Sequence, residues 1–108
     1  MRGIKPTIVI KTYNPNSQAL KEILAGIEEE GMLHTLLDEY VQQDSCTLAR
    51  EAANISQVQV GIGLNDTIAT LCVHQLVDIL LFDTNTEFRF IGQNGSRYIK
   101  GDPFIASP

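Results

Sequence analysis

The sequence predicts one α/β domain: a three-layer α/β/α sandwich with a mixed, mostly parallel sheet of about five strands, one of them antiparallel. The first observation is that strand-like β-branched runs alternate along the chain with amphipathic stretches of helical length. The second is that two strand-like runs are joined by a connection too short for a crossover helix, so this pair is antiparallel. The third is the length of 108 residues, which supports one hydrophobic core, so residues 1–108 form a single domain.

The first half of the chain alternates between two predicted strands and two predicted helices. Residues 7–12, "TIVIKT", are β-branched and lie between prolines, which is typical of a strand. Residues 14–31 predict a turn and an amphipathic helix, with asparagine and serine as N-cap candidates and a closing glycine. A strand is expected at residues 34–37 from their position in the chain. Small apolar residues at helical spacing predict a short helix at residues 44–54.

The second half contains three predicted strands and a last helix. Residues 58–64 alternate apolar side chains with glutamine and glycine, so another element can approach the glycine face closely. The β-branched residues 67–74 predict the antiparallel partner of this strand. Residues 78–82, "DILLF", are a continuous apolar run typical of a strand buried on both faces. The last helix is expected from residue 86 to residue 100, ending at Gly101.

Composition and charge exclude several classes of protein. The formal net charge is −5 and aromatic residues make up 6%, with no basic stripe, so nucleic-acid binding is not expected. No apolar run approaches the roughly 18 residues of a membrane span, and the N-terminus lacks the apolar stretch of a signal peptide. We therefore expect a cytoplasmic protein without nucleic-acid or membrane partners.

No residue pattern in the sequence predicts an active site. A Gly-x-Gly pair at residues 61–63 lacks the third glycine and the following helix of a dinucleotide fingerprint. His34 and His74 lie forty residues apart without a metal-ligand pattern between them, and Cys46 and Cys72 match no zinc or redox spacing. We therefore expect a non-catalytic protein with no cofactor of its own.

The stretch "GIEEEG", residues 26–31, places three carboxylates at the C-terminal end of the first predicted helix, where the helix dipole favours cations. On a helical wheel with Leu20 at 0°, the apolar residues lie within about 60° and Glu29 lies near 180°, opposite the core. A flat outer face with one projecting carboxylate suits contact with a protein surface that presents a cation or a metal. The residues predicted to surround Glu29 on this interface are Glu22, Ala25, Gly26, Glu28 and Glu30.

Two interpretations of these acids remain open from the residues alone. The first is a solvated acidic helix end, because acidic surface runs are common. The second is ligation of a metal, which requires about six oxygen ligands for magnesium or calcium. Consecutive helical side chains point about 100° apart, so only one of the three acids can bind a given ion. The remaining ligands would come from elsewhere.

Three motifs, taken in chain order, resemble the small (β) subunit of the diol/glycerol dehydratase reactivase. They are "GIEEEG", the central "VGIG" and the C-terminal "RFIGQNGSRYIKGDPF". The last motif, residues 89–104, is the most specific of the three. The resemblance extends from about Thr7 to Phe104 and is weak over residues 33–57. A related domain occurs in the medium subunit of the B12-dependent dehydratase itself, which is the nearest rival.

The resemblance implies a non-catalytic subunit of a chaperone-like complex and an anticodon-binding-domain-like fold. In this family a large subunit with an actin/Hsp70-like ATPase fold hydrolyses the nucleotide, and the assembly is α2β2. The small subunit leaves the large subunit, which then holds the damaged B12-dependent dehydratase so that inactivated cobalamin is released. A glutamate of the acidic run reaches a magnesium or calcium ion held by the large subunit. The matching residue in this sequence is Glu29.

Two other functions stay open from the sequence. One is a medium-subunit domain of the dehydratase that contributes to a cobalamin pocket, although that subunit normally carries an N-terminal extension. The other is an orphan α/β interaction domain. The sequence also leaves open which dehydratase is served, which metal is used, and whether the protein associates with a bacterial microcompartment.

Overall fold

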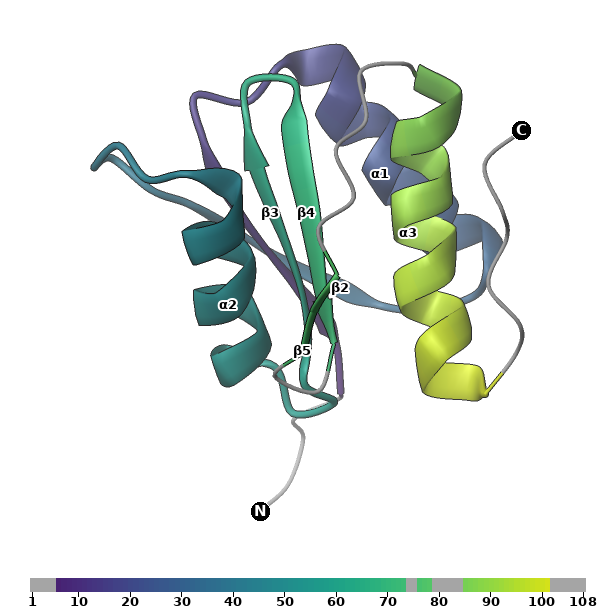
Figure 1. The fold of residues 1–108 in the computed structure, drawn as a ribbon. Helices are drawn as coiled ribbons and strands as arrows, with labels where there is room; N and C mark the ends of the chain where they lie inside the picture. The colour runs from purple at the N-terminus through teal and green to yellow at the C-terminus, as the bar shows by residue number, and fades with distance from the viewer. Residues whose placement is uncertain (1–5, 74–75, 79–84, 102–108) are drawn as a thin grey trace.

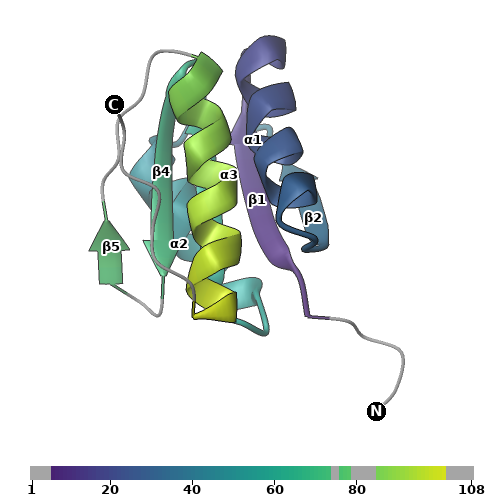
Figure 2. The ribbon, with the colours of Figure 1, turned by 90° about the vertical axis from the view of Figure 1, so that its right-hand side faces the viewer.

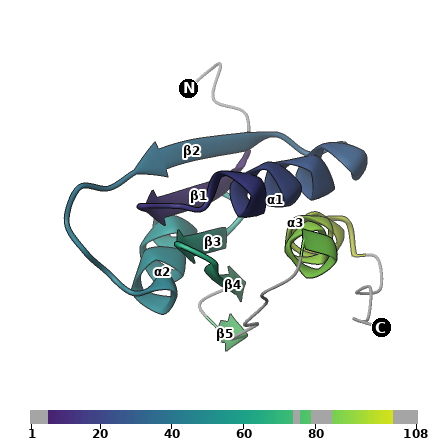
Figure 3. The ribbon, with the colours of Figure 1, turned by 90° about the horizontal axis from the view of Figure 1, so that it is seen from above.

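The protein has the predicted three-layer α/β/α architecture in the computed structural model (Figure 1). The structure describes residues 6–73, 76–78 and 85–101. In chain order its elements are β1 (Ile8–Tyr13), α1 (Ser17–Glu29), β2 (His34–Asp38), α2 (Ser45–Ile55), β3 (Val60–Asn65), β4 (Ile68–Val73), β5 (Leu76–Asp78) and α3 (Asn85–Lys100). The sheet lies between α2 on one face and the pair α1 and α3 on the other (Figure 3).

The five strands form one sheet in the order β2-β1-β3-β4-β5. β1 lies between β2 and β3 and is parallel to both, with Ile10 opposite Leu36 on one side and Ile62 on the other. β4 is antiparallel to β3 and to β5, so it is the one strand that runs against the rest. The predicted fold class, the mostly parallel sheet and the single antiparallel strand are therefore confirmed.

The predicted elements agree closely with the observed ones except at β5. The apolar run predicts a strand at residues 78–82, whereas β5 is Leu76–Asp78 and residues 79–82 lie outside the described part of the chain. Pairing with β4, in which Cys72 lies opposite Val77, defines this strand. Backbone pairing of this kind leaves no signature in the apolar pattern, which explains why the start of this strand at Leu76 was not predicted.

Side-chain caps fix where the first two helices begin. The side chain of Asn16 accepts a hydrogen bond from the backbone N–H of Ala19 at the start of α1, at 3.0 Å. Asp44 does the same for the N–H of Thr47 at the start of α2, at 2.7 Å. This backbone hydrogen bond is the main reason why the pKa of Asp44 lies below its ordinary value. Gly31 follows α1 with a φ of 78°, a conformation that favours glycine.

The two faces of β3 pack against different layers. Val60, Ile62 and Leu64 join the main core beneath α1 and α3. On the other face, a Cβ on Gly61 or Gly63 would collide with the backbone of α2. The predicted close approach to the glycine face is therefore confirmed, and α2 is the element that makes it. This packing leaves no room for a cofactor at the Gly-x-Gly pair.

Candidate functional site

The helices α1 and α3 lie side by side on one face of the sheet, as Figure 2 shows. They meet at Gly26 and Gly92, both of which are buried. A Cβ on Gly26 would collide with the carbonyl oxygen of Arg89, and a Cβ on Gly92 would collide with the carbonyl oxygen of Ile23. The two backbones therefore touch directly, and only glycine fits at either position.

This contact corrects the predicted outer face of α1. The helical wheel places Gly26 on the exposed side, whereas α3 covers it. The fully buried residues of α1 are centred on Ile23, while Leu20 and Leu24 are only half-buried. The buried stripe is thus rotated toward α3. A wheel drawn for one helix assigns the largest apolar residues to the core, and it cannot show that a second helix packs on glycine.

Charged and amide side chains line the junction of the two helices, which we call the α1–α3 seam. Its members on α1 are Glu22, Glu29 and Glu30, and its members on α3 are Arg89, Gln93, Arg97 and Lys100. Every acid of the seam has a hydrogen-bond partner on α3. The three predicted interface residues Glu22, Glu29 and Glu30 are therefore brought together, with partners that the sequence did not assign to them.

Arg89 links two acids that lie two turns apart on α1. Its Nη2 lies 2.7 Å from Glu22 Oε1 and its Nη1 lies 3.1 Å from Glu29 Oε2. Gln93 Nε2 donates to the other carboxylate oxygen of Glu29 at 2.7 Å. The Glu29 side chain nevertheless stays 44% exposed, so a group from another molecule can reach it. The seam thus orients the Glu29 carboxylate without burying it.

Glu30 is held more tightly than Glu29. Arg97 Nε lies 3.0 Å from one of its carboxylate oxygens and Lys100 Nζ lies 2.7 Å from the other, and the side chain is 11% exposed. The hydrogen bond from Lys100 is the main cause of a lowered pKa for Glu30, with further lowering by the charge of Arg97. Lys100 Nζ also donates to the backbone carbonyl of Glu30 at 3.2 Å.

These contacts explain how α1 carries acids at its C-terminal end. The dipole of α1 is unfavourable for an anion at that position. Arg97 and Lys100 from α3 bring two positive charges to the same place, so they neutralise Glu30 and stabilise the helix end together. The interpretation as a merely solvated acidic end is therefore wrong for Glu30. Glu28, by contrast, is exposed and forms no ion pair with any of the described residues.

The side of α1 away from α3 carries a shallow groove. Half-buried Leu20 and Leu24 form its apolar floor, while Lys21 and Glu28 give it one charge of each sign. Ala25, predicted as an interface residue, lines the same groove. Ala25 and Glu28 therefore remain accessible, on a surface that adjoins Glu29 on the helical wheel.

The described residues do not form a complete metal site. Among them, no group of three or more histidine, cysteine, aspartate or glutamate side chains is placed to hold an ion. Glu29 offers one exposed carboxylate, and an oxygen ligand of this kind suits magnesium or calcium. A metal bound at Glu29 would therefore need its other ligands from outside the described residues.

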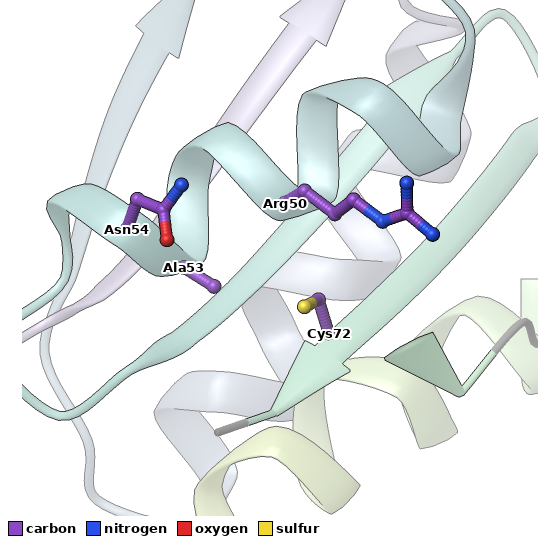
Figure 4. Close-up of a pocket in the computed structure, with 4 residues that line it drawn as sticks. All are labelled: Arg50, Ala53, Asn54 and Cys72. Atoms are coloured by element: carbon purple, nitrogen blue, oxygen red, sulfur yellow. The ribbon is translucent and has the colours of Figure 1, made fainter. Parts of the chain in front are cut away.

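A second hollow lies on the opposite side of the sheet, between α2 and β4 (Figure 4). It is lined by Arg50, Ala53, Asn54 and the buried Cys72. No carboxylate or imidazole lines it among the residues that the structure describes, so it lacks the acid–base groups of a catalytic site. Cys46 and Cys72 lie on different elements and both are free thiols. His74 lies outside the described residues.

The basic half of the seam is the part that sequence reasoning missed. Arg89, Gln93, Arg97 and Lys100 recur at spacings of three or four residues, which places them on one face of a helix. On α1, Glu22 lies four residues before Gly26, and Glu29 and Glu30 lie three and four residues after it. Reading the two helices as a complementary pair would have predicted the contact.

Comparisons with known proteins agree with this arrangement. The family described as "Dehydratase medium subunit" matches residues 5–105. The propanediol dehydratase-reactivating factor small subunit of Salmonella typhimurium strain LT2 is 33% identical over 107 residues, covering 92% of this chain and 90% of that protein.

Two solved structures share the fold over nearly their whole length. A diol dehydratase-reactivating factor complexed with ADP and Mg2+ matches with a TM-score of 0.84 at 27% identity, covering 95% of this chain and all of that one. A glycerol dehydratase reactivase matches with a TM-score of 0.82 at 23% identity, covering 94% and 98%, which shows a shared fold. The chain therefore belongs to the dehydratase medium-subunit family and is similar, within it, to the small subunits of dehydratase-reactivating factors.

Proposed function

We propose that this protein is the small subunit of a reactivating factor for an adenosylcobalamin-dependent diol or glycerol dehydratase. The observation that carries the proposal is its 33% identity, over nearly the full length of both chains, to the small subunit of a propanediol dehydratase-reactivating factor. In this role the protein is a non-catalytic binding subunit, and ATP hydrolysis takes place in a larger partner subunit. No helix of the described residues is long and apolar enough to cross a membrane.

The docking face that we propose is the exposed side of α1 with Glu29 at its margin. The groove lined by Leu20, Leu24 and Ala25 offers apolar contact area, and Glu28 adds an accessible charge beside it. Glu29 supplies one carboxylate ligand to a divalent metal, magnesium or calcium, that the larger subunit holds. The other ligands belong to that subunit.

Arg89 and Gln93 prepare Glu29 for this contact. Both of its oxygens already accept a hydrogen bond, so the carboxylate is oriented before a partner arrives. Each carboxylate oxygen has two lone pairs, so a metal can bind without displacing both donors. The guanidinium of Arg89 competes for the same negative charge, which keeps the interaction with the partner reversible.

Reversible docking is what exchange of subunits requires. The family to which the chain belongs takes its description, "Dehydratase medium subunit", from a subunit of the dehydratase. A domain of the same fold in the dehydratase can therefore compete for the surface that the small subunit leaves. We propose that this displacement lets the larger subunit hold the damaged enzyme in an α2β2-derived complex until inactivated cobalamin leaves. The work takes place in the cytoplasm, free or within a microcompartment.

The test is the affinity of this chain for a reactivase large subunit, measured by titration calorimetry in magnesium and in chelator. Glu29→Gln keeps the size of the side chain and one of its two acceptor oxygens but removes the charge. Glu51→Gln is the matched control, because Glu51 lies on α2 at the other face of the sheet, is 43% exposed and also pairs with one cation, Lys11. We expect chelation to weaken wild-type binding, Glu29→Gln to bind weakly in both conditions, and Glu51→Gln to behave like wild type.

Two results would contradict parts of this proposal. Equal binding of Glu29→Gln and wild type in both conditions would remove the metal role of Glu29. Absence of binding by the wild-type chain would remove the reactivase role.

The second candidate, a cobalamin-binding domain of the dehydratase medium subunit, rests on the description of the matching family. Tight binding of cobalamin by the isolated chain, measured from the change in the absorption spectrum of cobalamin, would favour this second candidate.

A further inference from the structure

The strand β2 forms an edge of the sheet, at the opposite end from β5 (Figure 3). Four of the seven exposed large apolar side chains among the described residues lie in residues 33–41: Leu33, Leu36, Tyr40 and Val41. Leu36 is 42% exposed in the middle of the strand, and Tyr40 is 92% exposed just beyond it. We call residues 33–41 the β2 edge. A cluster of this kind on a free sheet edge indicates an interaction surface.

The β2 edge lacks the devices that usually protect a sheet edge. Residues 33–41 contain no lysine, arginine or proline. The carboxylate of Glu39 lies 3.2 Å from Lys11 Nζ, and that of Asp38 accepts a hydrogen bond from the Thr12 hydroxyl at 2.8 Å. Both acids therefore have a partner on β1, and Asp38 is still exposed.

Alternate residues of β2 direct their backbone groups away from β1. The carbonyl of Leu33 accepts from the N–H of Ile8 at 3.0 Å, and the N–H of Glu39 donates to the carbonyl of Thr12 at 2.7 Å. Odd-numbered residues of β2 thus direct their peptide groups toward β1. Because peptide groups alternate along a strand, the N–H and C=O groups of His34, Leu36 and Asp38 point away from the sheet.

These three residues are self-complementary about Leu36. In an antiparallel pair with a two-fold axis at this residue, Leu36 lies opposite Leu36 of a second copy. His34 of each copy then lies opposite Asp38 of the other. All three positions are the hydrogen-bonded kind, because each residue directs both its peptide groups toward the partner. An imidazole faces a carboxylate at the two outer positions, and the exposed leucines face each other at the centre.

The exposed side chains of Leu33 and Tyr40 lie just outside the two ends of this strand, so they add apolar area at both ends of such a pair. We propose that the β2 edge pairs antiparallel with the β2 edge of a second copy of this chain, joining two sheets into one across a two-fold axis centred on Leu36. An isologous contact of this kind is the usual form of a homodimer.

The contact is small and is therefore reversible. It joins two five-residue strands, so its buried area falls in the class of weak, transient interfaces. It also lies apart from the α1–α3 seam, and it requires no larger subunit. The association of the isolated chain with itself is thus a separate property from the proposed docking of Glu29.

The experiment is sedimentation velocity of the purified chain over a range of concentrations. Leu36→Lys and Leu36→Glu each place two like charges opposite each other at the centre of the pair, which destabilises it. An equimolar mixture of the two variants places opposite charges there instead. Ile68→Lys is the control, since Ile68 is an exposed apolar strand residue on β4, three strands away from β2.

We expect wild type and Ile68→Lys to form a dimer as the concentration rises, and each Leu36 variant alone to stay monomeric. The equimolar mixture of the two Leu36 variants recovers the dimer. Circular dichroism of each variant, recorded before sedimentation, identifies chains that have not folded. A wild-type chain that stays monomeric at every concentration overturns the proposal. A dimer that survives in Leu36→Lys, or one that the mixture fails to recover, overturns the two-fold register.

Discussion

The α1–α3 seam and the β2 edge differ in how completely the chain supplies its own partners. The seam carries three acids, and each has a hydrogen-bond partner on α3. The β2 edge carries exposed apolar side chains and outward peptide groups that no described element pairs. The most conspicuous part of the sequence, "GIEEEG", is thus largely satisfied within the molecule. The less conspicuous "LHTLLDEYV" is the region whose apolar side chains are exposed and whose outward peptide groups are paired by no described element. Stability measurements can separate the two regions.

Gly92→Ala is expected to have the largest effect, because it breaks the seam at its centre. The added Cβ would collide with the carbonyl oxygen of Ile23, which belongs to the backbone of α1 and cannot rotate away. The loss in free energy of unfolding should be roughly 2–3 kcal/mol, in the range of overpacking in a core. Urea denaturation followed by circular dichroism measures it.

Gly95→Ala is the matched control for this substitution, one turn further along α3. Its Cβ would meet Leu71 and Val60 side-chain atoms at 3.4 Å, an ordinary contact. Alanine is favoured over glycine in a helix by about 1 kcal/mol, so Gly95→Ala should leave stability unchanged or raise it. Equal destabilisation by both substitutions would show that loss of glycine, rather than helix contact, is the cause.

Glu30→Gln should have the next largest effect. Removing the charge leaves Arg97 and Lys100 without their counter-ion and should cost about 1 kcal/mol at neutral pH. The pKa of Glu30 is lowered below 4.5 in the folded protein, so its contribution is complete above pH 4.5 and is lost as the pH falls through the lowered value. The difference between wild type and Glu30→Gln should therefore shrink in acid, and a constant difference down to low pH would contradict the ion pairing. Thermal unfolding measured from neutral pH to pH 3 tests this.

Glu29→Gln should change stability less than Glu30→Gln does. The Glu29 carboxylate is largely exposed, and exposed ion pairs contribute about 0.2–1 kcal/mol. We expect a loss near the lower end of this range, because Gln93 can still donate to the amide oxygen. A large loss in urea denaturation would show that Glu29 is mainly structural, and it would weaken the case for a docking role.

Leu36→Lys should leave the stability of the monomer almost unchanged. Leu36 is part-exposed at the sheet edge, and its peptide groups take no part in the pairing with β1. Measured at a concentration where the wild type is monomeric, the free energy of unfolding should stay within about 0.5 kcal/mol of wild type. A larger loss would mean that Leu36 belongs to the core rather than to an interaction surface.

Sequence reasoning predicted most of the fold because local signals determine it. The asparagine and aspartate caps, the glycine after α1 and the alternating pattern of β3 each specify their element locally. The short connection between β3 and β4 specified the antiparallel strand. The start of β5 at Leu76 was not predicted, because it depends on pairing with β4, which the apolar pattern does not record.

The site was predicted less completely, and for a different reason. The wheel identified Glu29 as a projecting carboxylate, and the structure leaves it exposed. It placed Gly26 in solvent, because the packing of one helix against another depends on residues more than 60 positions away. The partners of Glu29 and Glu30 could not be inferred from α1 alone for the same reason. Complementary spacing in α3 was the available signal.

The distance along the chain between the two halves of the seam has a consequence for folding during synthesis. Arg97 and Lys100 lie 67 and 70 residues after Glu30, at the end of the last helix. The first helix therefore emerges from the ribosome with its acidic end uncompensated and gains its counter-ions only when the chain has been made as far as residue 100. Contacts this far apart in sequence form late and slow the folding of a domain. A newly made chain therefore stabilises the end of its first helix only after α3 has been made.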